Sequence, residues 1–146
     1  MIVLDTNVLS VLMRPKRPET VMAWFRRQPA EILWTTSITV FEAWAGIEQV
    51  EEVQRRQALQ SAFGRALDHV LEGRILDFDA AAGREAARLM AERRRRGRAV
   101  ELRDTQIAGI VRASKATLAT RNIRDFADAG IALVDPWAAE ADRGRP

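Results

Sequence analysis

Five residues that could hold a metal ion stand far apart in the chain, each where a strand is expected to end or a helix to begin. They are Asp5, Glu42, Asp104, Asn122 and Asp125. The first three have no basic residue three or four positions away. Carboxylates brought together repel one another, and a hard divalent cation commonly stabilises such a cluster. The pattern therefore predicts a metal site assembled from distant parts of the chain.

Asp5 directly follows the apolar run Ile2–Leu4, which is expected to form the first strand. It would then stand at the carboxyl end of that strand, on the edge of an open α/β sheet where ligands characteristically bind. The alternative is that Asp5 only caps the helix expected to begin near Val8, although Thr6 or Asn7 could fill that role equally well.

Glu42 and Asp104 each have a structural alternative as well. Glu42 lies in a mainly apolar helical stretch, and its uncharged neighbours one turn away provide no local ion pair. It either faces solvent by chance or is kept for function. Asp104 falls in the first turn of a helix expected from Arg103 to Ser114, where the helix dipole by itself favours an acid. Parallel strands would bring such positions to one edge of a sheet.

Asn122 and Asp125 follow the fourth expected strand. They are three residues apart, so they share one side of the chain if this turn is helical. Either could complete a coordination sphere, directly or through water. The alternative is an ordinary turn, in which Asn and Asp are common for backbone reasons.

The elements that must position these residues alternate between short apolar runs and longer helical segments. This alternation is typical of an α/β protein with a parallel sheet covered by helices on both faces. We expect a three-layer α/β/α sandwich around a short sheet of four or five strands. The strand candidates are Ile2–Leu4, Ile32–Thr35, Arg74–Phe78, Ala116–Ala119 and Ile131–Val134.

Helix boundaries can be read at several positions. Ser37 is expected to cap the helix that carries Glu42, and Asp79 a later helix that ends with the arginine run 93–96 before Gly97. Cations at the end of a helix complement its dipole, so this run predicts a solvated helix end or a contact with a partner.

The composition is that of an ordinary globular protein, with 146 residues, 47% hydrophobic residues and a net charge of +3. We expect one domain over residues 1–139 and a frayed tail over 140–146.

No apolar run approaches the roughly 20 residues of a membrane span. The absence of cysteine fits a reducing compartment, and we expect a cytoplasmic protein. All but two of the 23 basic residues are arginine, which suits phosphates and carboxylates alike.

Several segments together resemble the PIN-domain ribonucleases, and specifically the VapC-type toxins of bacterial toxin-antitoxin pairs. The resemblance covers nearly the whole chain and its motifs occur in the right order. They are Ile2–Leu9, Ser37–Glu42, Asp104–Ala108, Thr120–Asn122 and Asp135–Trp137.

The resemblance implies a metal-dependent endoribonuclease that inhibits translation by cutting RNA. It further implies Mg²⁺ or Mn²⁺ as cofactor, a homodimer and a cognate antitoxin that silences the enzyme. Asp5, Glu42 and Asp104 match the principal acids of the family. Asn122 departs from it, since relatives frequently have a fourth acid there, and Asp125 is the candidate to substitute one turn on.

Chemistry at this site would depend on carboxylates and water, because the chain has no cysteine and its one histidine, His69, is remote from the acids. Oxygen donors suit Mg²⁺ or Mn²⁺ better than zinc. We expect Asp5 and Asp104 to bind metal directly, and Glu42 to ligate it or to position the attacking water.

Three further residues, Arg103, Arg121 and Arg124, lie near the later acids in sequence and could steer an RNA backbone towards them.

Other functions remain open at this point. One is a binding module that keeps the fold without catalysis, which the departure at Asn122 allows. Another is a metal-dependent phosphatase of the haloacid dehalogenase type, which would need a second acid where Asn7 stands. A receiver domain would need a lysine where the chain has Asp135 and Pro136.

Overall fold

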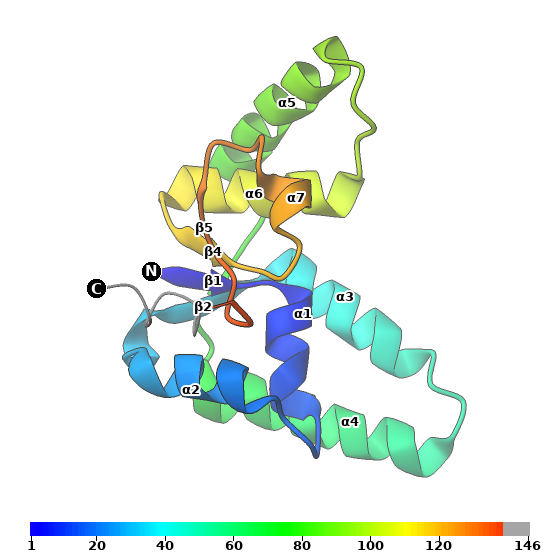
Figure 1. Cartoon of the computed structure of the whole chain (residues 1–146). Helices are drawn as coiled ribbons and strands as arrows, with labels where there is room; N and C mark the ends of the chain where they lie inside the picture. The colour runs from blue at the N-terminus through cyan, green and yellow to red at the C-terminus, as the bar shows by residue number, and fades with distance from the viewer. Residues whose placement is uncertain (139–146) are drawn as a thin grey trace.

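A five-stranded parallel sheet forms the centre of the computed structural model, which describes residues 1–138. The strand order is β3-β2-β1-β4-β5, so β1 lies in the middle. Helices cover both faces of the sheet (Figure 1). The strands are β1 (Ile2–Leu4), β2 (Leu33–Thr36), β3 (Ile75–Leu76), β4 (Thr117–Ala119) and β5 (Ala132–Val134). The predicted three-layer α/β/α sandwich is confirmed.

The helices divide between the two faces of the sheet. Figure 1 shows α1 to α4 on one side and α5 to α7 on the other. Their bounds are α1 (Thr6–Leu9), α2 (Glu19–Arg27), α3 (Ser37–Glu48), α4 (Val53–Arg65), α5 (Ala80–Arg95), α6 (Leu102–Ser114) and α7 (Ile123–Phe126). Short helical turns add η1 (Ser10–Met13), η2 (Ala30–Ile32) and η3 (Ala66–Val70). None of the helices within residues 1–138 is long and apolar enough to cross a membrane.

Two hydrophobic cores lie on opposite faces of the sheet, and alternate residues of β1 supply both. Ile2 and Leu4 pack with residues of α1 to α4, whereas Val3 packs with residues of α5 to α7. This alternation follows from the two-residue period of a strand. Because β1 is buried on both faces, its carboxyl end is held firmly, and Asp5 is the next residue.

The first strand has the predicted bounds, the bounds of the others lie within one or two residues of those predicted, and β3 differs most. It was expected to continue to Phe78 but has only two residues. The backbone N–H of Phe78 donates instead to the hydroxyl of Ser37 at 3.2 Å. The chain thus leaves the edge of the sheet early. The tail expected over 140–146 lies outside the described residues.

One helix cap differs from the sequence prediction, and another had been left open. Thr36 caps α3, where Ser37 was expected, and Asp5 caps α1, for which Asp5, Thr6 and Asn7 were all candidates. Both capping residues directly follow or end a strand and keep extended backbone angles, with ψ of 167° for Asp5 and 156° for Thr36. Each strand therefore passes straight into its helix, and the last extended residue is the cap. Asp79 caps α5 as predicted.

Candidate functional site

Asp5 lies at the carboxyl end of β1, almost fully buried, and uses both carboxylate oxygens. Oδ1 accepts a hydrogen bond from the N–H of Thr6 at 2.8 Å, and Oδ2 accepts one from the hydroxyl of Thr120 at 2.8 Å. Its own N–H donates to the carbonyl of Ala119 at 3.0 Å. The side chain thus caps α1, and it also lies at the carboxyl end of β1, where it was expected.

Glu42 lies on α3 and reaches towards the start of α1. The hydroxyl of Thr6 donates to Glu42 Oε1 at 3.5 Å, which is the long limit for such a bond. No ion pair was expected within its own helix, but Arg103 approaches from α6, with Nη1 3.8 Å from Glu42 Oε2. Because the Arg103 side chain is half exposed, solvent weakens this attraction.

Asp104 lies in the first turn of α6, which begins at Leu102 after the cap residue Glu101. Glu101 Oε2 accepts a hydrogen bond from the N–H of Asp104 at 2.6 Å. Sequence reasoning did not single out Glu101, because Glu is not among the residues preferred at a helix N-cap. The cap therefore adds a further negative charge beside Asp104.

The charges of these acids act on one another across three elements. Burial, followed by repulsion from Asp5, raises the pKa of Glu42 above its usual value. The pKa of Asp104 is raised to about 6, first by burial and then by repulsion from Glu101 and Asp5. Burial also raises the pKa of Asp5, against the hydrogen bond from Thr120. The fold has thus gathered the predicted acids into one region, in which their charges repel one another.

Asn122 and Asp125 lie at the exposed rim of this region, and Asn122 precedes α7 directly while Asp125 lies within it. The N–H of Asp125 donates to the carbonyl of Asn122 at 3.1 Å. Repulsion from Asp125 contributes to the raised pKa values of Asp5 and Asp104. Asp125 thus belongs to the same electrostatic region, whereas Asn122 brings no charge to it.

The donor set fits Mg²⁺ or Mn²⁺ in a particular way. Within residues 1–138 no three Asp, Glu, His or Cys side chains form a group that could hold an ion by themselves. Mg²⁺ is usually bound through one or two carboxylates and completes its shell with water and substrate phosphates. The oxygen donors and the mutual repulsion of the acids suit that mode of binding.

The three arginines proposed to contact RNA are all exposed. The guanidinium of Arg121 lies 4.8 Å from the ring centre of Trp137, and its backbone N–H donates to Asn7 Oδ1 at 3.2 Å. Arg103 lies over the ring of Phe41, at 5.8 Å. These aromatic contacts orient the cations while leaving them accessible. Arg124 is exposed on α7.

One arginine of the 93–96 run was interpreted wrongly from the sequence. Arg93 is neither a solvated helix end nor a surface for a partner, since only 3% of it is exposed. It forms an ion pair with Asp128 at 2.9 Å. The other three arginines of the run are exposed, as predicted.

Comparison with known proteins agrees with this geometry. The model of the PIN domain family matches residues 2–132, so the chain belongs to the PIN-domain family. It is 37% identical to plasmid stability protein StbB of Pseudomonas syringae pv. tomato, over 95% of this chain and all of that protein. It is 36% identical to VapC ribonuclease Y4jK of Sinorhizobium fredii, over 94% of this chain and 98% of that protein.

A third relative is known in sequence and in structure. Toxin FitB of Neisseria gonorrhoeae is 30% identical over 94% of this chain and 99% of that protein. The crystal structure of FitAcB from the same organism matches with a TM-score of 0.85 and covers 94% of this chain and 99% of that chain.

Proposed function

We propose that this protein is a Mg²⁺-dependent endoribonuclease that acts as the toxin of a bacterial type II toxin-antitoxin pair and inhibits translation by cleaving RNA. The observation that carries the proposal is the convergence of Asp5, Glu42 and Asp104 from the end of β1 and from two helices. Thr6 donates to both Asp5 and Glu42, and Asp5 contributes to the raised pKa of Asp104. Relatives named as a ribonuclease and as a toxin support it.

Each acid has a distinct role in the proposed reaction. Asp5 and Asp104 are the residues that would hold Mg²⁺, and Glu42 would orient the attacking water. The ion, when bound, stabilises charge on the phosphate and favours ionisation of water. The hydrogen bonds from Thr6 and Thr120 fix both oxygens of Asp5, so this carboxylate needs little rearrangement to bind a cation.

The exposed arginines serve the substrate. Arg103, Arg121 and Arg124 offer positive charge near an acidic centre that would otherwise repel a polyanion. Contacts with phosphates supply affinity without reading the bases. We therefore assign these three residues to binding the RNA backbone. Mn²⁺ could replace Mg²⁺ because it accepts the same oxygen donors.

A binding module without catalysis is the competing function, and the observation in its favour is Asn122, which brings no charge to the rim. The PIN-domain match favours the nuclease over a phosphatase. If the binding module were correct, the protein would retain RNA without cutting it at any concentration of metal.

The deciding experiment is cleavage of total RNA by the parent protein and by Asp5→Asn, with Mg²⁺ or with a chelator. Glu48→Gln provides a matched control, because Glu48 is an exposed acid on α3 whose carboxylate accepts only from Gln60 among the described side chains. We expect the parent and Glu48→Gln to cleave RNA in Mg²⁺ and not in the chelator. Asp5→Asn should cleave it in neither condition. Undiminished cleavage by Asp5→Asn, or cleavage in the chelator, would refute the proposal.

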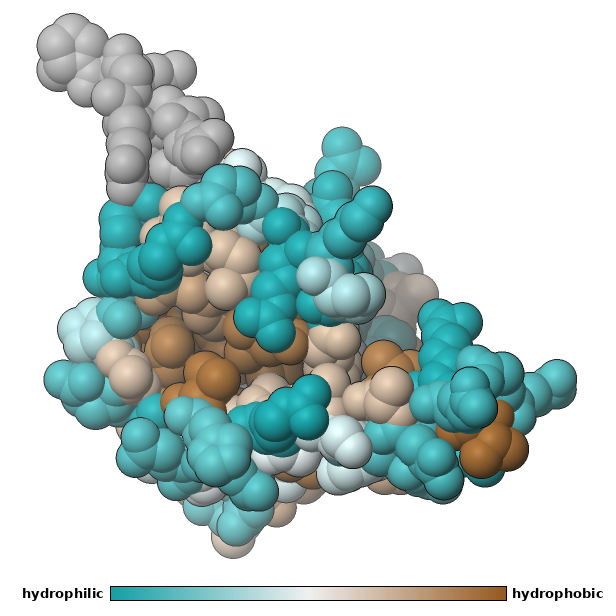
Figure 2. All heavy atoms as spheres, turned by 90° about the horizontal axis from the view of Figure 1, so that it is seen from below, coloured by the Kyte–Doolittle hydropathy of each residue, from teal (hydrophilic) through white to brown (hydrophobic). Residues whose placement is uncertain are grey.

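A groove on a different face suits the antitoxin. It has a volume of about 940 Å³ and lies between α4 and the segment from η1 to Arg17. Figure 2 shows apolar atoms in a hollow bordered by hydrophilic side chains on this face. The apolar lining includes Leu12, Met13, Leu59, Ala62, Ala66 and Val70.

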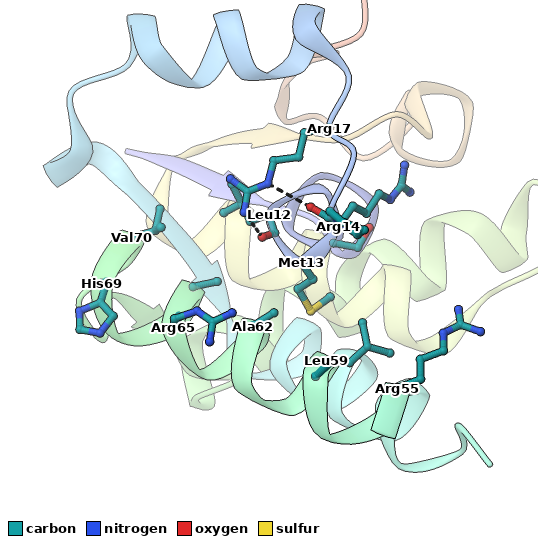
Figure 3. Close-up of a pocket in the computed structure, with 14 residues that line it drawn as sticks. Leu12, Met13, Arg14, Arg17, Arg55, Leu59, Ala62, Arg65, His69 and Val70 are labelled. Carbon is teal, nitrogen blue, oxygen red and sulfur yellow. Dashed lines mark hydrogen bonds between the residues drawn. The ribbon is translucent and has the colours of Figure 1, made fainter. Parts of the chain in front are cut away.

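Arginines surround this groove. Figure 3 shows Arg14, Arg17, Arg55 and Arg65 around the apolar side chains. Arg17 is held in place by donating to the carbonyls of Leu12 at 2.7 Å and Arg14 at 3.2 Å. An amphipathic segment with an apolar face and flanking carboxylates would match both the lining and the charge. We assign the groove to such a segment of the antitoxin.

A further inference from the structure

Arg93 is a buried cation on α5 whose guanidinium contacts two other parts of the chain. Nε and Nη2 donate to the two carboxylate oxygens of Asp128 at 3.0 and 2.9 Å. Nη1 donates to the hydroxyl of Thr105 at 3.0 Å, and Nη2 donates to the backbone carbonyl of Asp125 at 2.8 Å. Such a buried charge is stable only when it is paired and its donors are satisfied, as they are here.

These contacts join the two segments that carry the later acids of the site. Thr105 is the residue after Asp104, and its hydroxyl also donates to the carbonyl of Glu101 at 2.8 Å. The other contact is to the backbone of Asp125 itself. Since the two acids repel one another, their segments need an attachment that does not depend on the metal. Arg93 provides it from the interior.

Arg98 shows that pairing with Asp128 does not by itself connect the two segments. Its Nη1 lies 3.0 Å from Asp128 Oδ2, and its Nη2 donates to the carbonyl of Arg124 at 3.0 Å. Both contacts are to the segment that contains α7 and the residues after it. Arg93 additionally reaches α6, which requires the fork of donors that a guanidinium has.

We propose that Arg93 is a positioning residue that holds the Asp104 and Asp125 segments at the separation that Mg²⁺ binding and RNA cleavage require. The inference rests on the proposed function. This positioning role predicts that replacing the guanidinium will weaken Mg²⁺ binding and raise the Mg²⁺ concentration that cleavage requires. RNA binding, which depends on exposed arginines, should stay the same.

The test is Arg93→Lys, because lysine keeps the charge beside Asp128 but cannot reach Thr105 and the Asp125 carbonyl together. We expect the Mg²⁺ concentration for half-maximal cleavage to rise roughly 10- to 100-fold and kcat to fall, as for other groups that orient metal ligands. KM for RNA should stay within about twofold. Calorimetry without RNA should show the same weakening of Mg²⁺ binding.

Thr105→Val is the second variant, because it removes the link to α6 and leaves the Asp128 ion pair in place. It should shift the Mg²⁺ requirement in the same direction, and the double variant should be no worse than Arg93→Lys. Arg95→Lys, an exposed change on the same helix, should match the parent.

The outcomes separate this inference from the proposed function. If the parent binds Mg²⁺ and cleaves RNA while both variants match it, the role of Arg93 is refuted and the function stands. If the parent binds Mg²⁺ without cleaving RNA and Arg93→Lys weakens that binding, the positioning role stands and the function falls. A parent that neither binds Mg²⁺ nor cleaves RNA would overturn both.

Discussion

Asp5 combines structural and electrostatic roles in one side chain. One oxygen caps α1 and the other accepts from Thr120, 115 residues away, so the carboxylate joins the start of the chain to the end of β4. Burial nevertheless disfavours its negative charge, and this raises the pKa of Asp5. Such a conflict is typical of functional sites, where a residue is retained at some cost to stability.

Asp5→Asn should therefore raise the melting temperature in chelator. The amide still accepts from Thr6, the hydroxyl of Thr120 can rotate to accept instead of donate, and the buried charge is gone. We expect an increase of a few degrees by differential scanning fluorimetry.

Added Mg²⁺ should then stabilise the parent more than the variant, because a ligand raises stability only where it binds the folded state. Equal melting temperatures for the two proteins, with and without metal, would argue against a shared cation site.

Asp104 gives a pH dependence with a defined sign. Its pKa is raised from 3.8 to about 6 by burial and by repulsion from Glu101 and Asp5. The folded protein therefore holds this proton more tightly than the unfolded chain does. Ionisation of Asp104 thus costs stability as the pH rises from about 4 to about 6.

In chelator the free energy of unfolding should fall over this pH range through Asp104, and Asp104→Asn should make the fall shallower. Urea unfolding at several pH values would measure the slope. A slope for Asp104→Asn as steep as that of the parent would contradict the assignment.

At the scale of elements, the contact between α5 and α6 is unusually close. A Cβ on Gly109 of α6 would lie 2.6 Å from the carbonyl oxygen of Ala82 and 2.7 Å from Cβ of Ala86, both on α5. Only hydrogen at this position lets the helices approach so closely. The same pair of helices carries Arg93 and Asp104, so their spacing also sets the spacing of the site.

Gly109→Ala should accordingly lower the free energy of unfolding by about 1 to 3 kcal/mol, the usual cost of overpacking. Gly64→Ala is a matched control in α4, where a Cβ would have no neighbour within 4 Å. It should raise stability by about 0.5 to 1 kcal/mol, because alanine favours the helix. Chemical denaturation would measure both, and a neutral effect of Gly109→Ala would show that the helices can separate without cost.

The whole molecule presents two surfaces of opposite character. Acids gather at the carboxyl edge of the sheet, whereas the groove beside α4 is apolar with a basic rim (Figure 3). The first surface suits a cation and the second an acidic amphipathic segment. Separate surfaces for catalysis and for the partner would let a toxin bind its antitoxin strongly without altering the residues that cleave RNA.

Reversing two charges on the rim should test the partner surface. In an Asp5→Asn background, Arg55→Glu with Arg65→Glu should weaken binding to the cognate antitoxin by about tenfold or more, since like charges at an interface are costly. Arg95→Glu, on α5, should bind like the parent. Calorimetry at two salt concentrations would measure the change, and unaltered affinity would place the antitoxin elsewhere.

The sequence by itself determined the features whose signals are local. Short apolar runs predicted all five strands and their order along the chain, because each is bounded by residues that end a strand. Asp5, Glu42 and Asp104 could be selected because their immediate neighbours leave their charges uncompensated.

Only the tertiary structure decided which distant groups meet. Arg93 has the sequence surroundings of an exposed helix end, and its burial depends on Thr105 and Asp128, which are 12 and 35 residues further along. The hydrogen bond between Asp5 and Thr120, and the coupling among the acids, likewise join remote segments. A residue's neighbours in sequence set its preference for helix or strand, whereas its partners in space depend on how the layers pack.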